Sequence, residues 1–209
     1  MHRARPHAAT HSRERRHRLA HEAARLMAES GIRDYHLAKM KAAQQLGIHD
    51  EASLPRNSEI EDALREHQRL FAGARHGQQL RQRREAAQQA MEFLHAFSPR
   101  LVGPVLEGTA DAHSPVQLHL FDDDADAVQR FLDEHGIPSD ARVRRLRLDR
   151  QRSVDAPAWL FVAESLNFEL VVLPYDALRQ APLSPTDDKP MRRASLAQLR
   201  QLLAEAAVP

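Results

Sequence analysis

Histidine is the residue type that first suggests metal chemistry in this chain, which has 13 histidines and no cysteine. His17 and His21 are the only close pair on an expected helix, and their spacing of four residues would place both rings on one helical face. Imidazole nitrogens bind zinc, but zinc sites in proteins normally use three or four protein ligands. Because no third ligand lies nearby in the sequence, we interpret the pair as part of a solvated helix face.

Three consecutive carboxylates, Asp122, Asp123 and Asp124, follow an apolar segment and are a second candidate for binding a cation. Carboxylate oxygens are the ligands that Mg²⁺ prefers. The same residues precede an expected helix at 124–135, where acidic side chains favour the helix N-terminus and one of them can cap it. We favour the helix start, because metal binding would require two of these side chains to point back towards Gly108.

A segment of small and apolar residues, VGPVLEGTADAHSPVQLHLF, occupies residues 102–121. It resembles the opening of the nucleotidyltransferase superfamily, which includes the polymerase-β-like enzymes. In that family a strand ends in Gly-Ser, a short loop follows, and a second strand begins Ser-Asp-x-Asp. The glycine and the hydroxyl hold the nucleotide phosphates, the two aspartates bind catalytic metal ions, and a later strand supplies a third carboxylate. The resemblance covers about residues 97–175.

The phosphate-binding positions of the resemblance are filled by residues of suitable type. Gly108 and Thr109 stand at the Gly-Ser position, and Ser114 stands at the serine before the aspartates. The resemblance therefore implies that these three residues would hold a nucleotide. His119 lies two residues after Gln117, so both would share one face of a strand. His119 would then lie in the former active-site cleft, or simply on a half-exposed strand.

The metal-binding positions of the resemblance are not filled in the same way. Pro115 stands where the family has its first aspartate, Gln117 stands at the second, and Glu169 offers the third carboxylate. Two-metal phosphoryl transfer requires anionic oxygens around Mg²⁺, whereas proline offers no side-chain ligand and a neutral amide is a poor one. We therefore expect the family's reaction to be lost, with no catalytic residue and no cofactor. Mg²⁺ would be needed only if the chain were an active enzyme, with Asp122 and Glu169 as the candidate ligands.

The elements that would position these residues change in type near residue 97. Residues 1–15 lack apolar periodicity and are expected to form a disordered basic tail, and residues 16–97 show the periodicity of about four helices. Residues 98–209 are expected to form an α/β domain. Its expected strands are 101–106, 116–121, 142–148, 159–162 and 168–173, and its expected helices are 124–135 and 195–206. The predicted fold class is α+β, with a helical N-terminal domain followed by a nucleotidyltransferase-like domain that has a small mixed sheet flanked by helices.

Charge is distributed unevenly along the chain although the net charge is +1. Residues 1–100 carry 18 basic and 12 acidic side chains, which gives +6, and residues 101–209 carry the remaining 12 and 17, which gives −5. The basic half could approach RNA phosphates, or the two halves could simply attract each other. The N-terminal residues that would contact RNA are Arg13, Arg15, Arg16 and Arg18. Basic groups at 144–147 and 192–193 could also contact phosphate, and ordinary surface charge explains them equally.

No apolar run approaches the roughly 18 residues that a membrane-spanning helix requires. The N-terminus is rich in Arg and His and lacks the apolar segment that is typical of a secretory signal peptide. The sequence therefore predicts a cytoplasmic protein without a membrane partner. The first predicted function is a catalytically degenerate nucleotidyltransferase-fold protein that binds a protein or nucleotide as a regulatory module. Two alternatives stay open: an active nucleotidyltransferase with a rearranged acidic metal site, and an RNA-associated adaptor.

Overall fold

The computed structural model describes residues 5–48, 50–68, 73–149 and 151–206, and its contacts divide the chain into two compact units. The helical unit comprises Met1–His76 and Pro185–Asp187, and the sheet unit comprises Gly77–Ser184 and Asp188–Pro209. The predicted α+β class, with helices first and a mixed sheet second, is confirmed. No helix in the described ranges has both the length and the hydropathy required to cross a membrane.

Among the residues that the structure describes, the helical unit contains α1 (Arg5–Ser30), α2 (Tyr35–Leu46), η1 (Glu51–Ser53) and α3 (Asn57–His67), together with the first residues of the next helix. The Asp34 side chain accepts a hydrogen bond from the Leu37 N–H at the start of α2, and Gly47 ends α2 in a left-handed conformation. The core combines small and branched side chains, which lets the helices pack closely. Its members include Leu19, Ala23, Ala38, Ala42, Ile60 and Leu64.

The N-terminal tail differs from its prediction. A disordered tail was expected for residues 1–15, whereas α1 begins at Arg5; residues 1–4 lie outside the described residues. Helix formation is limited by its first turn, and each further residue adds a hydrogen bond at little additional cost. Because residues 19–27 already form a packed helix, a preceding stretch rich in arginine, a good helix former, extends it without a new nucleus.

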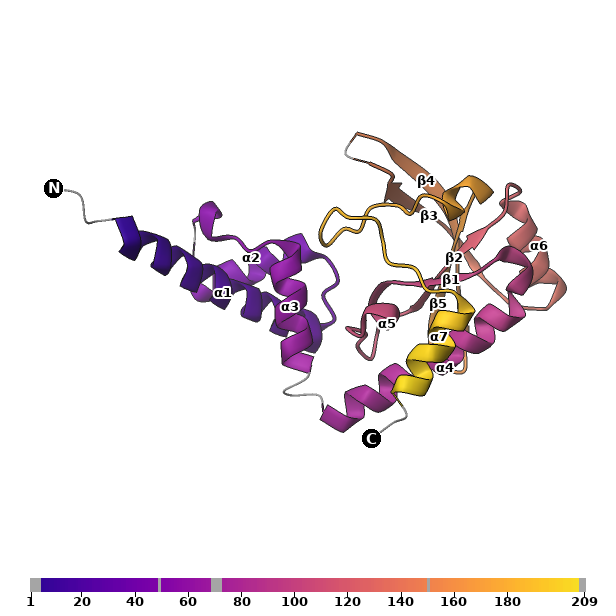
Figure 1. Ribbon diagram of the computed structural model, residues 1–209, viewed down its shortest axis with the longest axis horizontal. Helices are drawn as coiled ribbons and strands as arrows, with labels where there is room; N and C mark the ends of the chain where they lie inside the picture. The colour runs from indigo at the N-terminus through magenta and orange to yellow at the C-terminus, as the bar shows by residue number, and fades with distance from the viewer. Residues whose placement is uncertain (1–4, 49, 69–72, 150, 207–209) are drawn as a thin grey trace. The chain divides into compact units, whose positions relative to one another are not determined.

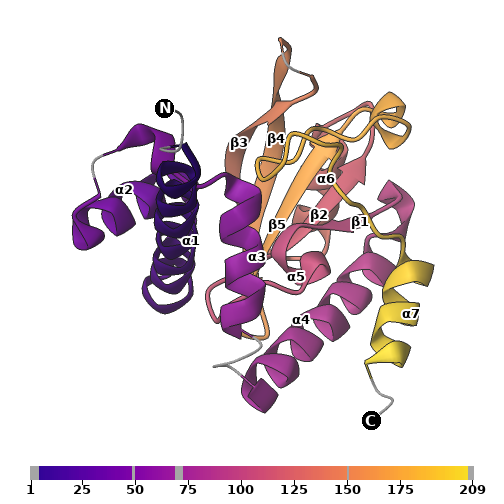
Figure 2. The same cartoon turned by 60° about the vertical axis from the view of Figure 1, so that its left-hand side comes forward.

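The sheet unit contains one five-stranded sheet in the order β1-β2-β5-β4-β3 within the described residues. The strands are β1 (Arg100–Val102), β2 (Val116–Phe121), β3 (Asp140–Arg147), β4 (Ser153–Ala163) and β5 (Leu166–Leu173). Strands β2 and β5 are parallel, and every other neighbouring pair is antiparallel. Strands β3 and β4 continue past their pairing with β5 as a two-stranded ribbon, which Figures 1 and 2 show beyond the main sheet.

The two faces of the sheet have different cores. One face packs against α4 (Gly73–Phe93), α6 (Asp126–Glu134) and α7 (Leu196–Glu205) in the larger apolar cluster. Helix α7 lies beside α4 in both views (Figures 1 and 2), and Arg200 of α7 forms an ion pair with Glu92 of α4 at 2.8 Å. The other face has a smaller cluster around Phe121, which includes residues of η4 (Tyr175–Leu178). This second face carries the polar residues of interest.

The first strand of the sheet unit is shorter than predicted. A strand was expected over 101–106, but β1 ends at Val102 and the short helix α5 (Gly103–Glu107) follows directly. Gly103 has φ +69°, a conformation that disfavours residues with a Cβ. Pro104 then supplies the fixed φ that suits the first turn of a helix. The Gly-Pro pair therefore ends the strand, although the apolar residues after it fit a strand pattern.

The boundary between the units also lies earlier than the predicted boundary between residues 97 and 98. The contacts divide the chain between His76 and Gly77, inside α4. The apolar stripe of α4 includes Ala87 and Met91, and these residues and Leu94, which directly follows the helix, are buried in the same cluster as the sheet. The helix therefore belongs to the sheet unit for most of its length, because amphipathic periodicity predicts a buried face without showing which partner buries it.

Candidate functional site

Two of the predicted site residues are neighbours on the sheet. The parallel register of β2 and β5 places Gln117 directly opposite Glu169. The Gln117 Nε2 donates a hydrogen bond to Glu169 Oε2 at 2.7 Å. Glu169 is only 3% exposed, so its carboxylate requires hydrogen-bond partners or a counter-charge within the protein.

The counter-charge for Glu169 comes from Arg144 on β3. The guanidinium of Arg144 donates from Nε to Glu169 Oε1 and from Nη2 to Oε2, the latter at 2.9 Å. These hydrogen bonds raise the pKa of Arg144 above its ordinary value. Together with the Gln117 amide, they give the carboxylate three hydrogen bonds, two of them charge-assisted. Both oxygens of Glu169 therefore accept from the guanidinium of Arg144, and Oε2 also accepts from the amide of Gln117.

The pairing of Arg144 with Glu169 was not predicted from the sequence, where Arg144 appeared only as part of a basic stretch. The strand register pairs Arg144 of β3 with Ala156 of β4. The β3 residue that lies directly across the sheet from Glu169, along the line of cross-strand pairs through β4, is Asp140. One feature of the sequence is consistent with this pairing, namely small side chains on the strand that separates Arg144 from Glu169. Strand β4, between β3 and β5, offers the buried alanines Ala156 and Ala158 on this side, and small side chains leave room for a long arginine to cross.

The glycine beside Gln117 is Gly103, and not the Gly108 that the sequence suggested. A Cβ added to Gly103 would lie 2.1 Å from Gln117 Oε1, which is far inside van der Waals contact. Gly108 ends α5 with φ +84°, and an added Cβ there would face Arg84 and Leu80 of α4 at 3.9 Å. The backbone that approaches the Gln117 amide therefore belongs to the turn between β1 and α5.

The loop after α5 is held by two arginines of α4. Arg83 is buried and donates to the backbone oxygens of Ala112 at 2.7 Å and Ser114 at 3.3 Å. Arg84 donates to the backbone oxygens of Val105 and Leu106, and burial lowers the pKa of Arg84. These contacts give backbone carbonyl groups of α5 and of the following loop side-chain hydrogen-bond donors. They fix the loop that carries the predicted phosphate-binding residues.

Thr109 and Ser114, two of those predicted residues, are both buried. The Ser114 Oγ donates to Asp111 Oδ1 at 2.8 Å and accepts from the Asp111 N–H at 2.9 Å. The hydroxyl is thus part of a local turn, an arrangement typical of serine and aspartate in loops.

His119 lies on the same face of β2 as Gln117, as expected from strand alternation. It is 2% exposed, and its Nδ1 has no hydrogen-bond partner among the described residues. Burial and the nearby positive charge of Arg193 lower the pKa of His119 to about 4, although Glu169 opposes this effect. His119 is therefore neutral at physiological pH.

Arg193 lies over this part of the sheet. It donates to the backbone oxygens of Ala177 and Leu178 at 2.7 and 2.9 Å, and its guanidinium carbon lies 5.4 Å from the centre of the Phe121 ring. Burial and the charge of Arg100 lower the pKa of Arg193. The basic pair at 192–193 therefore contributes one arginine to the packing of this face.

The acidic run at 122–124 precedes α6 as the sequence favoured, although the N-cap residue of the helix is Ala125. Asp122 accepts from the Asp124 N–H at 2.8 Å, and Asp123 accepts from the Tyr175 N–H at 3.1 Å. Asp124 accepts from the Asp126 N–H and pairs with Arg130 at 2.6 Å. The hydrogen bond from Arg130 lowers the pKa of Asp124. Asp122 and Asp124 thus serve the turn before α6, whereas Asp123 accepts from the first residue of η4.

The four arginines proposed to contact RNA all lie in α1. Arg16 donates to the backbone oxygen of Ala52 at 2.7 Å, while Arg13, Arg15 and Arg18 are exposed. Three of the four side chains are therefore accessible to a large anion.

Comparison of the chain with models of protein families, with curated proteins and with solved structures found no match.

Proposed function

We propose that the sheet unit is a degenerate nucleotidyltransferase-like module, which binds a nucleotide or a protein ligand on the face around Gln117 and does not transfer nucleotides. The support comes from the hydrogen bonds of Glu169. In a metal-dependent site, this carboxylate would have to offer oxygen lone pairs to Mg²⁺. Here its oxygens accept from Arg144 and Gln117. A protein cation occupies the role that a metal ion would have.

The position of Gln117 supports the same proposal. The amide nitrogen donates to Glu169, so its remaining potential ligand is a neutral oxygen, which lies against the turn at Gly103. Binding of Mg²⁺ would require both the loss of the Arg144 ion pair and a rotation of this amide. Each of these changes leaves a buried polar group without its partner, and such groups are unfavourable.

A transfer assay tests the loss of activity. The full chain is incubated with radiolabelled nucleoside triphosphates and Mg²⁺ or Mn²⁺, and incorporation into RNA and protein acceptors is measured. We expect no incorporation above the protein-free background. Turnover that Glu169→Ala abolishes and Arg145→Gln retains would instead establish an active enzyme.

Calorimetry with nucleoside triphosphates tests the binding role. Because the site holds its own guanidinium, we expect nucleotide affinity to be the same in EDTA and in Mg²⁺. Gln117→Ala is expected to weaken it, with Gln129→Ala on the exposed surface of α6 as the matched control. Affinity that requires Mg²⁺ would contradict the proposal.

An RNA-associated role is a second candidate, supported by the exposure of Arg13, Arg15 and Arg18 on α1. Contacts between arginine and phosphate release counterions, so the binding constant K falls as the salt concentration rises. On single strands, log K falls by about 0.7 per phosphate contact for each tenfold increase in salt. Replacing the three arginines with glutamine is expected to reduce the slope of log K against log salt by roughly two units. An unchanged slope would exclude this surface as an RNA contact.

A further inference from the structure

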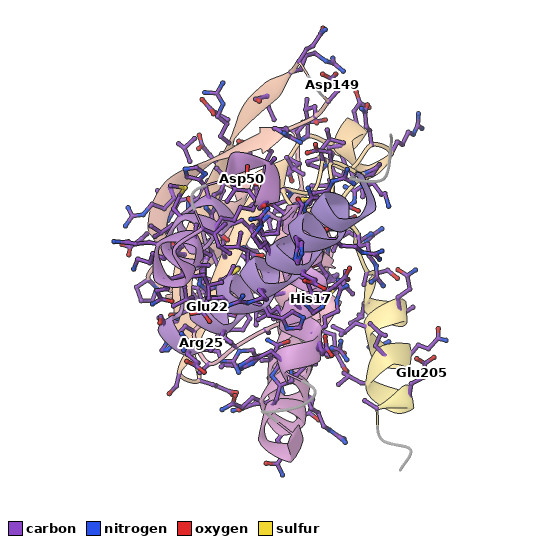
Figure 3. The ribbon with its side chains drawn as sticks, turned by 90° about the vertical axis from the view of Figure 1, so that its left-hand side faces the viewer. His17, Glu22, Arg25, Asp50, Asp149 and Glu205 are labelled. Atoms are coloured by element: carbon purple, nitrogen blue, oxygen red, sulfur yellow. The ribbon has the colours of Figure 1, made fainter. Side chains whose placement is uncertain are left out.

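His17 and His21 lie one turn apart on α1 and present the same ring nitrogen to each other. Their Nε2 atoms are 3.2 Å apart, and their ring centroids are 4.3 Å apart. His17 is exposed (Figure 3), and the side chain of His21 is 37% exposed. A small ion can therefore reach both rings from solvent.

The separation of the two nitrogens matches the spacing of two ligands on one metal ion. With metal–nitrogen bonds of about 2.0–2.1 Å, two ligands of a tetrahedral ion lie about 3.3–3.4 Å apart. Two adjacent ligands of a square-planar or octahedral ion lie about 2.9 Å apart by the same trigonometry. The observed 3.2 Å, at which the two nitrogens share a hydrogen bond, lies between these values, so a metal ion that replaces the shared proton would need no large change in the separation of the two nitrogens.

A carboxylate stands next to the pair. Glu66 of α3 has its Oε2 3.6 Å from His21 Nε2, and its side chain is 48% exposed. Its negative charge favours a cation at this position. No group of three His, Asp or Glu side chains in the described part of the chain is arranged to hold a metal ion. The two imidazoles would therefore be the protein ligands, and water would complete the coordination.

We propose that His17 and His21 form an exposed two-histidine site for a divalent transition-metal cation of the type that imidazole prefers. Among these cations, affinity for a nitrogen site rises to a maximum at Cu²⁺. The sequence alone did not favour this site, because residue spacing shows a shared helical face but does not show that both Nε2 atoms converge. The site is independent of the face around Glu169, since it lies in the other unit.

His11 provides a matched control. It lies on the same helix, is exposed, and has a carboxylate of Glu14 at 3.6 Å from its Nδ1. It therefore shares with His21 a histidine and a nearby carboxylate at the same distance. Any copper binding that depends only on an isolated surface histidine would be affected by His11→Ala as much as by His17→Ala or His21→Ala.

The experiment titrates the full chain with Cu²⁺ by calorimetry and records electron paramagnetic resonance of the copper-loaded protein. Removal of a second-shell partner weakens metal sites by about 10–100-fold, so loss of a direct ligand is expected to raise the Kd by at least about tenfold. We expect this for His17→Ala and His21→Ala, together with loss of the nitrogen hyperfine pattern of two imidazoles. His11→Ala is expected to retain both. Equal effects of all three variants, or no effect of the first two, would overturn the proposal, and circular dichroism checks that each variant stays helical.

Discussion

Replacing Arg144 with glutamine is expected to destabilise the sheet unit by about 1–3 kcal/mol. The change removes two hydrogen bonds and the counter-charge from Glu169, whose side chain is 4% exposed. Breaking a fully buried ion pair costs about 3–5 kcal/mol. The Arg144 side chain is 51% exposed, so water can replace part of what is lost, and the Gln117 hydrogen bond remains. The expected loss is therefore smaller than for a fully buried pair.

The measurement uses the single tryptophan of the chain. Trp159 is 5% exposed in the core of the sheet unit, so its fluorescence during urea unfolding reports on that unit alone. Arg145→Gln is the matched control, because the neighbouring side chain of a strand points to the opposite face, and its change is expected to stay within about 0.5 kcal/mol. Combining Arg144→Gln with Glu169→Gln completes a double-mutant cycle, with an expected coupling of about 1–2 kcal/mol.

Two results would refute this reasoning. If Arg144→Gln and Arg145→Gln reduced the free energy of unfolding equally, Arg144 would act only as surface charge. If the double-mutant cycle gave no coupling, Glu169 would not depend on the guanidinium, and the comparison of Arg144 with a metal ion would fail.

Three further predictions concern the same face. Folding lowers the pKa of His119 from 6.5 to about 4, so between pH 4 and pH 6.5 the unfolded chain binds more protons than the folded chain. The free energy of unfolding therefore declines as the pH falls through this range, by up to about 3 kcal/mol. His119→Gln should flatten this part of the pH profile of urea unfolding, and an unchanged profile would contradict the assignment. Gly103→Ala places a Cβ against the Gln117 amide, whereas Gly136 has a similar φ and no heavy atom within 4 Å of such a Cβ. In thermal unfolding, Gly103→Ala should reduce the free energy of unfolding by about 1–3 kcal/mol more than Gly136→Ala does. Equal reductions would show that the turn at Gly103 can shift to accommodate a Cβ. Gln117→Asp combined with Arg144→Gln places a second carboxylate beside Glu169 and removes its guanidinium partner, so Mn²⁺ should raise the Tm of this double variant more than that of Arg144→Gln alone; equal responses to Mn²⁺ would argue against a metal-site geometry.

The sequence was sufficient for those parts of the site that depend on local pattern. The segments containing Gln117 and Glu169 were predicted as strands, and the resemblance placed both residues in one site. The structure brings these two residues into direct contact through the β2–β5 register. The predicted face of His119 followed from simple alternation along β2.

The remaining features of the site depend on contacts between residues that are far apart in the sequence, which local sequence patterns do not show. The partner of Glu169 is Arg144, which lies two strands away and outside the row that the register assigns to Glu169. The choice between Gly103 and Gly108 depends on which turn approaches Gln117, and both glycines have positive φ. Sequence shows that each can adopt this conformation, but only the packing of α5 against the sheet shows which one is required.

The burial of α4 against the sheet has a consequence for dividing the protein into fragments. A fragment that starts at residue 98, where the sequence pattern changes, would lack Ala87, Met91 and Leu94, which are all at most 1% exposed. Burial of a large apolar side chain contributes about 1.5–3 kcal/mol, so losing Met91 and Leu94 alone would remove about 3–6 kcal/mol, comparable to the lower end of a domain's net stability, about 5 kcal/mol. A fragment intended to fold alone should therefore include the part of α4 that carries these residues, and any transfer of the sheet into another protein should include it as well.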